Sequence, residues 1–496
     1  MILDRDNPPS GTVRDWLDMR ADKGGTAISF PETGTSLLWA DLRTEAHDFA
    51  AALTARGAEK GDSVAIVAPN SKEGVIAFYG AVYGGFRATM INLAAGRDAI
   101  SYALDHSEAR FAYVHESCSN TFEEANSGGV IPLSLGSGTE VSLFDVEPGD
   151  HALLMYTSGT TGKPKGVVHT NSSLLAGGWT SAIAHDLTSK DRGFCVLPIY
   201  HINGLCVTVM GSLVSGGSLA MVSKFSASRF WDQVEAGGAT WFSVVPTIVS
   251  HLLHGSAEPT ETCRSQLRFG RSASSALAVE TQSAFEKRFG VPIIETMGLT
   301  ETAAQILSNP LPPSVRKIGS PGIAFGCIVM IQNSEGEEVP HGVEGEIVVQ
   351  GPNVLLEYLK NPEATSATFR DGWLRTGDLA RMDEDGYVYV TGRLKELIIK
   401  GGENIAPREI DEALYSHPDV IEAAAFARPC DSYGERVEAA VRLREGSRVS
   451  ADTLIKLCNG RLGSFKSPDA IHFMAELPKG PSGKIQRMKL ADVLPV

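Results

Sequence analysis

The stretch Thr157-Ser-Gly-Thr-Thr-Gly-Lys-Pro-Lys-Gly166 decides the fold of this 496-residue chain. It follows the apolar run Ala152 to Tyr156 and precedes a helical pattern, so it lies between a predicted strand and a predicted helix. A loop this rich in glycine and hydroxyl groups offers several N–H and O–H donors to a polyphosphate. Lys163 and Lys165 add positive charge. The stretch therefore predicts a phosphate-binding loop, although an isolated glycine-rich loop is more often a surface turn.

The spacing within this loop excludes the Walker type of phosphate site. A Walker loop needs a glycine, four further residues and then Gly-Lys-Ser/Thr. This chain has Thr157 at the position of the first glycine and Pro164 directly after Lys163. We therefore do not expect a P-loop NTPase.

Short β-rich runs alternate with helical patterns from about residue 60 to residue 300. This alternation predicts an α/β fold in which right-handed βαβ units form layers of parallel sheets. The predicted strands include Ser63 to Val67, Ala152 to Tyr156, Phe194 to Leu197, Ser218 to Val222 and Trp241 to Val245. The predicted helices include Ser226 to Ala236 and Ala278 to Arg288.

The pattern changes in the last third of the chain. Short strands separated by turn residues predict a β-rich subdomain at about residues 320–391. After Gly392-Arg393, a charged segment leads to a predicted helix at Pro407 to Tyr415 and a mixture of strands and helices. We expect a large N-terminal domain at residues 1–394 and a small, mobile α+β domain at residues 395–496, since about 100 residues is an ordinary domain size.

Length and composition narrow the functional class. A chain of 496 residues exceeds the roughly 250 to 300 residues that one hydrophobic core supports. The 44 Lys+Arg and 59 Asp+Glu give a net charge of -15, which disfavours nucleic acids and anionic membranes as partners. The uncharged stretch Gly193 to Ser223 contains Pro198 and several glycines, so it predicts a strand, a loop and a helix instead of a membrane span. The start of the chain shows no secretory signal and the seven cysteines form no CxxC pair, so we expect a cytoplasmic protein with reduced thiols.

Several motifs together point to one family. The string Thr157 to Gly166 resembles the signature loop of the adenylate-forming superfamily, which includes acyl-CoA synthetases, luciferases and the adenylation domains of peptide synthetases. Six further matches follow in the family's order and extend the resemblance over most of the chain. They are Pro198-Ile-Tyr-His201, Met297-Gly-Leu-Thr-Glu301, Trp373-Leu-Arg-Thr-Gly-Asp378-Leu, Gly392-Arg393-Leu-Lys395, Lys400-Gly-Gly-Glu-Asn-Ile and Pro478-Lys-Gly-Pro-Ser-Gly-Lys484.

The resemblance implies an enzyme that uses ATP, Mg2+ and coenzyme A. A carboxylic acid would first form acyl-AMP with release of pyrophosphate, and CoA would then form the thioester with release of AMP. Because the first step brings two anions together, it depends on positioning and charge neutralisation. The implied catalytic residues are Lys484, His201, Thr300 and Glu301. The implied ATP-binding residues are Thr157, Ser158, Gly159, Thr160, Thr161, Lys165, Ser274, Met297, Gly298, Thr300, Asp378, Arg393 and Lys484.

By the same resemblance, Lys484 bridges the carboxylate and the α-phosphate, and Thr300 contacts the α-phosphate. Glu301 binds Mg2+ with Thr157, which suits an ion that commonly takes one or two protein carboxylates and completes its shell with phosphates and water. Asp378 and Arg393 hold the ribose. Outside their motifs these residues would more often be surface charges or a surface ion pair.

His201 and Met297 are two further residues of the implied site. His201 is expected between the nucleotide and the acyl pocket, although a lone histidine among apolar residues is usually a core side chain. Met297 departs from the family pattern, which usually has an aromatic residue stacked on adenine at this position. Methionine can still pack against a base. The departure therefore concerns the contact that would recognise adenine.

The residues expected around the acid favour a small substrate. The segment Pro198 to Val207 lacks the aspartate that holds an amino-acid substrate in peptide synthetases, so an amino acid is disfavoured. The run Leu267-Arg-Phe-Gly-Arg271-Ser-Ala-Ser-Ser resembles the oxalyl-CoA synthetase branch. Arg271 is expected to neutralise a second anionic group on an oxalate-like, malonate-like or sulfonated acid, unless it is a structural arginine. The implied acyl pocket consists of His201, Asn203, Arg271, Met297 and Gly298.

The C-terminal motifs imply the second half-reaction. In the resembling family Lys395 is a hinge, and rotation about it exchanges Lys484 for the face that carries Lys400, Gly401 and Gly402. Glycines at that face let the pantetheine of CoA pass the backbone. This arrangement predicts two catalytic states of one enzyme.

Other functions remain open from the sequence. A ligase for a medium-chain or aromatic acid, or an enzyme that loads a carrier protein, would share these motifs. A luciferase-like oxygenase or a non-catalytic nucleotide-binding relative is disfavoured, the latter because Lys484 and Glu301 are intact. The sequence leaves open the acid, the pathway and the oligomeric state, for which a homodimer is one candidate.

Overall fold

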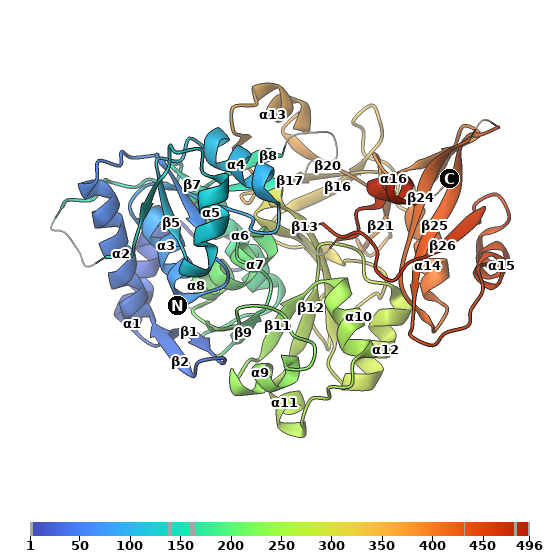
Figure 1. The fold of residues 1–496 in the computed structure, drawn as a ribbon, viewed down its shortest axis with the longest axis horizontal. Coiled ribbons are helices and arrows are strands. Elements are labelled where there is room, and N and C mark those ends of the chain that lie inside the picture. The colour runs from blue at the N-terminus through green and yellow to red at the C-terminus, as the bar shows by residue number, and fades with distance from the viewer. Residues whose placement is uncertain (1–2, 137–140, 158–163, 431, 481–483, 495–496) are drawn as a thin grey trace.

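Four β-sheets organise the chain (Figure 1). The structure is a computed structural model that describes residues 3–136, 141–157, 164–430, 432–480 and 484–494. The largest sheet has nine strands and is parallel from β1 through β13, with antiparallel partners at both edges. In spatial order its strands are β15 (Ile323–Ala324), β14 (Ala304–Ser308), β13 (Ile293–Leu299), β12 (Phe269–Ser272), β11 (Trp241–Val244), β9 (Arg192–Cys195), β10 (Ser218–Met221), β1 (Thr26–Phe30) and β2 (Thr35–Leu38).

This sheet is buried on both faces. Successive residues of its central strands belong to different apolar clusters: Trp241 packs with one cluster, and Phe242 packs with the other. Side chains alternate across a strand, so two clusters require cover on both sides of the sheet. Near-continuous apolar strands such as β11 follow from this burial.

The seven-stranded sheet carries the predicted phosphate loop between two of its strands. Its strands are β18 (Glu357–Tyr358), β8 (Lys165–Thr170), β7 (His151–Thr157), β4 (Arg87–Met90), β3 (Ser63–Val67), β5 (Phe111–Val114) and β6 (Ile131–Leu133). β7 and β8 form an antiparallel pair in which Thr157 lies opposite Lys165. The loop residues from Ser158 to Lys163 lie outside the described residues. Glu357 and Tyr358 extend the sheet beyond β8, although they lie almost 190 residues later in the chain.

Two smaller sheets follow. One contains β16 (Ile328–Gln332), β17 (Gly345–Gln350), β20 (Trp373–Met382), β19 (Phe369–Arg370) and β21 (Val388–Arg393). The other contains β23 (Glu403–Ile405), β22 (Ile398–Lys400), β25 (Gly434–Leu443), β24 (Val420–Cys430) and β26 (Ala470–Phe473). The last sheet, with its helices, is called the C-terminal unit below (residues 398–494), and it lies at one end of the molecule, opposite the N-terminal helices (Figure 1).

The helices cover these sheets. Those before the C-terminal unit are α1 (Val13–Lys23), α2 (Trp39–Ala55), α3 (Lys72–Tyr83), α4 (Arg97–His106), α5 (Ser119–Ala125), α6 (Asn171–Ala184), α7 (Ile202–Gly204), α8 (Gly211–Ser215), α9 (Phe230–Ala236), α10 (Pro246–His254), α11 (Glu261–Gln266), α12 (Val279–Phe289) and α13 (Pro362–Thr368). The C-terminal unit has α14 (Pro407–Tyr415), α15 (Ala451–Leu462) and α16 (Leu490–Val493). Short η segments are η1 (Glu116–Cys118), η2 (Leu205–Met210), η3 (Thr300–Thr302) and η4 (Arg487–Lys489).

The predicted α/β class is confirmed, with shifted boundaries in places. The strand expected at Phe194 to Leu197 is β9, which begins and ends two residues earlier because the buried apolar run continues past the strand. The helix expected from Ser226 begins only at Phe230, and the helix expected at Pro407 to Tyr415 has those bounds. The stretch Gly193 to Ser223 forms a strand, a loop and a helix whose middle turn, η2, is π-helical. Among the described residues, no helix combines the length and the apolar character needed to cross a membrane.

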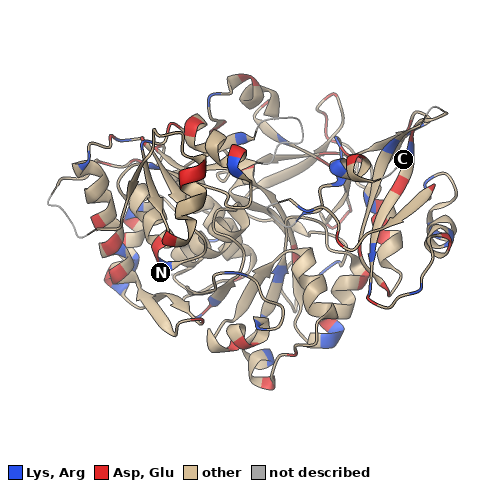
Figure 2. Cartoon of the chain, in the orientation of Figure 1, with Lys and Arg blue, Asp and Glu red and all other residues tan. Residues whose placement is uncertain are grey.

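Charged side chains lie mainly on outer elements, whereas most cysteines are buried. Figure 2 shows Lys, Arg, Asp and Glu mainly on outer helices and loops and on strands of the C-terminal unit, whereas the other strands are mostly uncharged. All seven cysteines are free. Five are buried, and Cys327 and Cys430 are partly exposed.

Candidate active site

A cavity of about 270 Å³ lies between the nine-stranded sheet, β20, β21 and the C-terminal unit. Six residues predicted from separate motifs line it together: Ser274, Met297, Gly298, Asp378, Arg393 and Lys484. They come from segments up to 210 residues apart in the sequence. The fold therefore brings six of the thirteen predicted nucleotide-binding residues to one place.

The backbone at this cavity is held in unusual conformations. Ser274, which lines the cavity, has a φ of 78° although it is not glycine. A Cβ atom at Gly298 would lie 1.5 Å from the carbonyl oxygen of Ala304, so only glycine fits where β13 and β14 pair with a bulge. Strained backbone persists only where the surrounding structure enforces it, and such residues gather at functional sites.

Asp378 and Arg393 form an ion pair on the cavity wall. They face each other across the antiparallel strands β20 and β21, with Arg393 Nε 2.6 Å from Asp378 Oδ1. Asp378 is only 4% exposed. The Asp378 carboxylate raises the pKa of the Arg393 guanidinium. The pair presents both an acceptor and a donor to a polar ligand.

Lys484 reaches the same cavity from the C-terminal unit. The described residues on either side of its loop are joined by backbone hydrogen bonds: Gly480 N donates to Lys484 O at 2.7 Å, and Gln486 N donates to Pro478 O at 2.8 Å. Burial and the nearby Arg393 lower the pKa of Lys484 to about 8, while Asp378 opposes this shift. A partly desolvated ammonium at this position is suited to bind an anion.

The Thr300–Glu301 turn lies beside the antiparallel strands β7 and β8, which are called the phosphate-loop hairpin below. His169 on β8 donates from Nε2 to Thr300 O at 2.7 Å, and its Nδ1 lies 3.1 Å from Ser173 Oγ. Burial lowers the pKa of His169 to about 4, so it is neutral at neutral pH. Tyr358 donates its hydroxyl hydrogen to Glu301 Oε1 at 2.8 Å. Sequence reasoning missed both His169 and Tyr358, because neither lies in a recognised motif.

Arg271 occupies a buried polar network next to the cavity. It is 2% exposed and lies on β12. Its Nη1 donates to Asn203 Oδ1 at 2.7 Å and to Ser243 Oγ at 3.1 Å, and its Nε donates to Gln305 Oε1 at 3.2 Å. All three acceptors are neutral. Burial lowers the pKa of Arg271 to about 9, so the group remains charged at neutral pH.

This network connects to the cavity of about 270 Å³, which is called the nucleotide cavity below after the ligand predicted for its lining residues. Asn203 Nδ2 donates to Ser274 Oγ at 3.2 Å, and Ser274 lines the cavity. His201, two residues before Asn203, caps α7, and its ring lies 5.0 Å from that of Tyr200 between centroids. The π-helical turn η2 follows directly, and such turns occur frequently at functional sites.

The residues predicted for CoA lie elsewhere. Lys400 is buried in the C-terminal unit with its Nζ 3.2 Å from Asp469 Oδ2. Gly401 and Gly402, with φ of 61° and 87°, form the turn between β22 and β23, and neither lines the nucleotide cavity. Lys395 is exposed in the turn between β21 and β22. In this arrangement Lys484, not the glycine turn, reaches the cavity.

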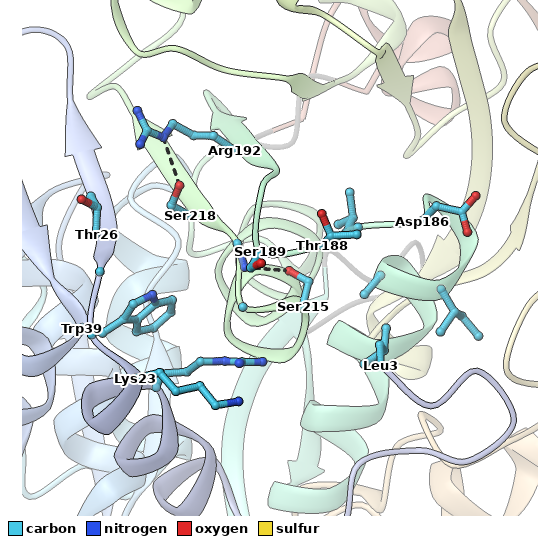
Figure 3. Close-up of a pocket in the computed structure, with 18 of the residues that line it drawn as sticks. Leu3, Lys23, Thr26, Trp39, Asp186, Thr188, Ser189, Arg192, Ser215 and Ser218 are labelled. Carbon is cyan, nitrogen blue, oxygen red and sulfur yellow. Dashed lines mark hydrogen bonds between the residues drawn. The ribbon is translucent and has the colours of Figure 1, made fainter. Parts of the chain in front are cut away.

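A larger cavity, of about 680 Å³, lies away from all of these residues (Figure 3). Two of its arginines already have acceptors: Arg20 donates to the carbonyl oxygens of Leu213 and Val214 at the end of α8, and Arg192 donates to Ser218 Oγ at 3.0 Å. None of the predicted site residues lines it. Size alone therefore does not identify the site.

No group of three His, Cys, Asp or Glu side chains that could hold a metal ion occurs in the part of the chain that the structure describes. Mg2+ instead commonly takes one or two carboxylates and fills its shell with phosphate oxygens and water. Glu301 beside the phosphate-loop hairpin fits that type of site.

Comparison with known proteins finds related sequences. The sequence profile described as AMP-binding enzyme matches residues 17–359, and the profile described as AMP-binding enzyme C-terminal domain matches residues 409–484. The chain is 43% identical over 479 residues to the sulfoacetate–CoA ligase of Cupriavidus necator, covering 93% of each chain. It is 36% identical over 457 residues to the oxalate–CoA ligase of Arabidopsis thaliana, covering 88% of this chain and 89% of the relative.

Solved structures add information on the arrangement. The chain matches ATP-bound MatB from Rhodopseudomonas palustris with a TM-score of 0.89 and 30% identity, covering 97% of this chain and 99% of that one. The apo form of the same protein matches with a TM-score of 0.78, covering 97% and 98%. The arrangement described above thus resembles the ATP-bound form more closely than the apo form.

Proposed function

This chain belongs to the family of AMP-binding enzymes, and we propose that it is an ATP-dependent acid–CoA ligase whose acid carries a second anionic group. The relatives named above are CoA ligases for sulfoacetate and oxalate. The single observation that carries the choice of acid is the buried Arg271, whose hydrogen-bond acceptors are neutral.

For the first half-reaction, the residues of the nucleotide cavity have complementary roles. Asp378 accepts hydrogen bonds from the ribose hydroxyls, and Arg393 donates to the same sugar. Lys484 lies between the acid and the α-phosphate and reduces their repulsion while a carboxylate oxygen attacks phosphorus and pyrophosphate leaves. Positioning two bound reactants in this way removes much of the entropic barrier of a bimolecular step.

Phosphate and metal binding involve the phosphate-loop hairpin. Lys165 and the loop from Thr157 onward contribute donors and charge to the β- and γ-phosphates. Glu301 would hold Mg2+ together with phosphate oxygens, and the ion would neutralise charge on the departing pyrophosphate. Thr300 is the proposed contact to the α-phosphate, and the hydrogen bond from His169 fixes its backbone.

The acid class follows from the charge of Arg271. A guanidinium buried among neutral acceptors loses hydration without gaining a counter-ion, which is unfavourable unless an anion completes the site. Nη1 and Nε are engaged, and no described residue accepts from Nη2. A carboxylate or sulfonate at the far end of a short acid would supply the missing charge. His201 and Asn203 would contact the acid beside it.

For the second half-reaction, we propose that residues 395–496 rotate about Lys395. Rotation would withdraw Lys484 and bring Lys400, Gly401 and Gly402 to the acyl-adenylate. The thiol sulfur of CoA would then bond to the acyl carbon, the bond to AMP would break, and the thiol proton would be released. The exposed position of Lys395 between β21 and β22 supports a hinge there.

The decisive experiment measures pyrophosphate release and AMP release with a panel of acids, with and without CoA. The panel pairs acids of similar size, such as sulfoacetate with propionate and malonate with butyrate. The proposal expects pyrophosphate release without CoA, AMP and thioester with CoA, and a preference for the dianionic member of each pair. Higher activity with medium-chain or aromatic acids would contradict the choice of acid. Failure of free CoA to accept the acyl group would indicate a carrier-protein acceptor instead.

A further inference from the structure

We infer that Tyr358 is a positioning residue of the adenylation site, which orients the Glu301 carboxylate through its hydroxyl and the Lys165 ammonium through its ring. This inference rests on the proposed function, in which Lys165 binds the phosphates of ATP and Glu301 holds Mg2+ during adenylation. Tyr358 itself need not touch a substrate.

The hydroxyl contact is short and protected from water. Tyr358 is 4% exposed, and its Oη lies 2.8 Å from Glu301 Oε1. A phenol is protonated at neutral pH, so the tyrosine donates and the carboxylate accepts. Hydrogen bonds to an ionised acceptor are roughly twice as strong as neutral ones. One oxygen of Glu301 is thereby held, and Oε2 is left for another ligand.

The ring makes a second, independent contact. Lys165 Nζ lies 4.5 Å from the centroid of the Tyr358 ring. An ammonium within about 6 Å of an aromatic face is attracted by the ring's quadrupole. A lysine side chain has several rotatable bonds, so this contact restricts where its charge lies. Tyr358 therefore contacts one anionic and one cationic side chain of the proposed phosphate site.

The backbone around Tyr358 is fixed to the elements that it contacts. In β18, Tyr358 pairs with Val167 of β8, the strand that begins at Lys165. Leu359 N donates to Gly166 O at 2.8 Å, and Leu355 N donates to Glu301 O at 2.7 Å. The β18 segment thus joins the phosphate-loop hairpin to the Thr300–Glu301 turn.

The helix α13 also anchors the backbone of Tyr358. Tyr358 N donates to Thr365 Oγ1 at 3.0 Å, and Thr365 lies in α13. With its backbone anchored on two sides, the ring has little freedom to follow Glu301 or Lys165. The two charged groups must instead adopt positions set by the ring, which is the preorganisation that phosphoryl chemistry needs.

Two variants separate the two contacts. Tyr358→Phe removes the hydroxyl and keeps the ring, so it isolates the contact to Glu301. Tyr358→Leu removes both contacts. The matched control is Tyr389→Phe on β21, because Tyr389 does not line the nucleotide cavity. It removes a hydroxyl that donates to Asp383 Oδ2 at 3.3 Å.

The measurements follow metal and nucleotide separately. Mn2+ binding in the presence of a non-hydrolysable ATP analogue is followed by electron paramagnetic resonance, and pyrophosphate exchange is measured as a function of Mg2+. Tyr358→Phe should weaken Mn2+ binding and raise the half-saturating Mg2+ concentration by about tenfold, because the lost bond is charge-assisted. Tyr358→Leu should weaken binding of the ATP analogue further. Thioester formation from supplied acyl-AMP should change less than about twofold, since it releases no pyrophosphate.

The possible outcomes are distinguishable. If the wild type catalyses exchange and Tyr358→Phe matches the wild type and Tyr389→Phe in Mn2+ and Mg2+ dependence, the inference is wrong. A loss of both half-reactions with a lowered melting temperature would indicate a purely structural tyrosine and would also overturn it. If the wild type shows no exchange with any acid, the proposed function fails first. A metal-specific defect confined to the first half-reaction supports the inference.

Discussion

Arg271 Nη1 lies 2.7 Å from Asn203 Oδ1, and Asn203 in turn donates to Ser274 Oγ at the nucleotide cavity. This chain of contacts links the proposed acid-binding charge to the proposed adenylation site. Arg271→Met should therefore lower kcat/KM for dianionic acids by about 10- to 100-fold, since a hydrogen bond to a charged group is worth about 1.5–3 kcal/mol. The measurement is pyrophosphate exchange with paired dianionic and monoanionic acids.

The same substitution should not reduce stability. Replacing a buried charge that lacks a counter-ion by an apolar side chain is often neutral or stabilising. The control is Arg268→Met, three residues earlier, which removes an exposed arginine that pairs with the buried Asp191. Equal loss of activity toward all acids in Arg271→Met would contradict a role in selecting the acid.

Lys484 predicts a pH limit for the first half-reaction. With its pKa lowered to about 8, the free enzyme loses this charge as the pH rises above 8. We expect kcat/KM for pyrophosphate exchange to fall about tenfold per pH unit above that value. Lys484→Ala should abolish exchange yet still form thioester from supplied acyl-AMP. Lys489→Ala, at an exposed lysine nearby, should retain the wild-type profile of both half-reactions.

Lys395→Pro should give the opposite separation. Proline fixes φ near −65° and would restrict rotation about the proposed hinge. The backbone N–H of Lys395 donates no hydrogen bond to a described residue, so the substitution removes none. Exchange should persist while thioester formation from supplied acyl-AMP is lost. Lys395→Ala is the control that keeps backbone freedom, and loss of both half-reactions in Lys395→Pro would argue against two states.

Arg408 on α14 holds the C-terminal unit in the arrangement described. Its Nη1 donates to Val390 O at 2.6 Å and its Nη2 to Gly319 O at 3.4 Å, both outside that unit. Arg408→Ala should slow exchange by roughly tenfold, because about 1–2 kcal/mol of contacts specific to this arrangement are lost. Thioester formation from acyl-AMP should be unchanged or faster. Arg444→Ala, which loses a bond to Pro418 within the unit, should not show this split.

His169 predicts a loss of stability in acid. Its folded-state pKa of about 4 lies below the ordinary value of 6.5, so its contribution is present above pH 6.5 and is lost as the pH falls toward 4. The unfolding free energy should fall by about 2 kcal/mol per such histidine between pH 7 and pH 5. His185, whose pKa burial lowers to about 3, contributes in the same direction. His169→Gln should reduce the pH slope in urea unfolding, and an unchanged slope would contradict the assignment.

Much of the fold is readable from local pattern. Ser63 to Val67 was predicted as a strand from its apolar residues and is β3, and Pro407 to Tyr415 is α14 because proline begins a helix well and its apolar positions recur at helical spacing. The end of β9 could not be read, because Val196 and Leu197 are buried like the strand before them. A buried apolar run has no sequence feature that marks where its hydrogen-bonded pairing stops.

The candidate site likewise contains residues that local motifs predict and contacts that depend on tertiary packing. Lys484, Asp378 and Arg393 could be predicted because each lies in a motif that contains glycine. Tyr358 contacts Glu301 only because β18 pairs with β8, a long-range pairing that no local pattern encodes. The neutral surroundings of Arg271, which decide what it can bind, are likewise a product of tertiary packing.

The distribution of thiols allows one position of the wild-type protein to be labelled with a dye. Cys430 ends β24 opposite Gly434, and Gly434 also pairs with Lys400 beside the Gly401–Gly402 turn. Burial raises the pKa of the Cys327 thiol to about 12, and the five buried cysteines are shielded from solvent. A maleimide dye should thus attach mainly at Cys430 without engineering. Its emission would then report changes near the glycine turn when ligands are added, so the wild-type sequence itself permits a test of the proposed rotation of residues 395–496.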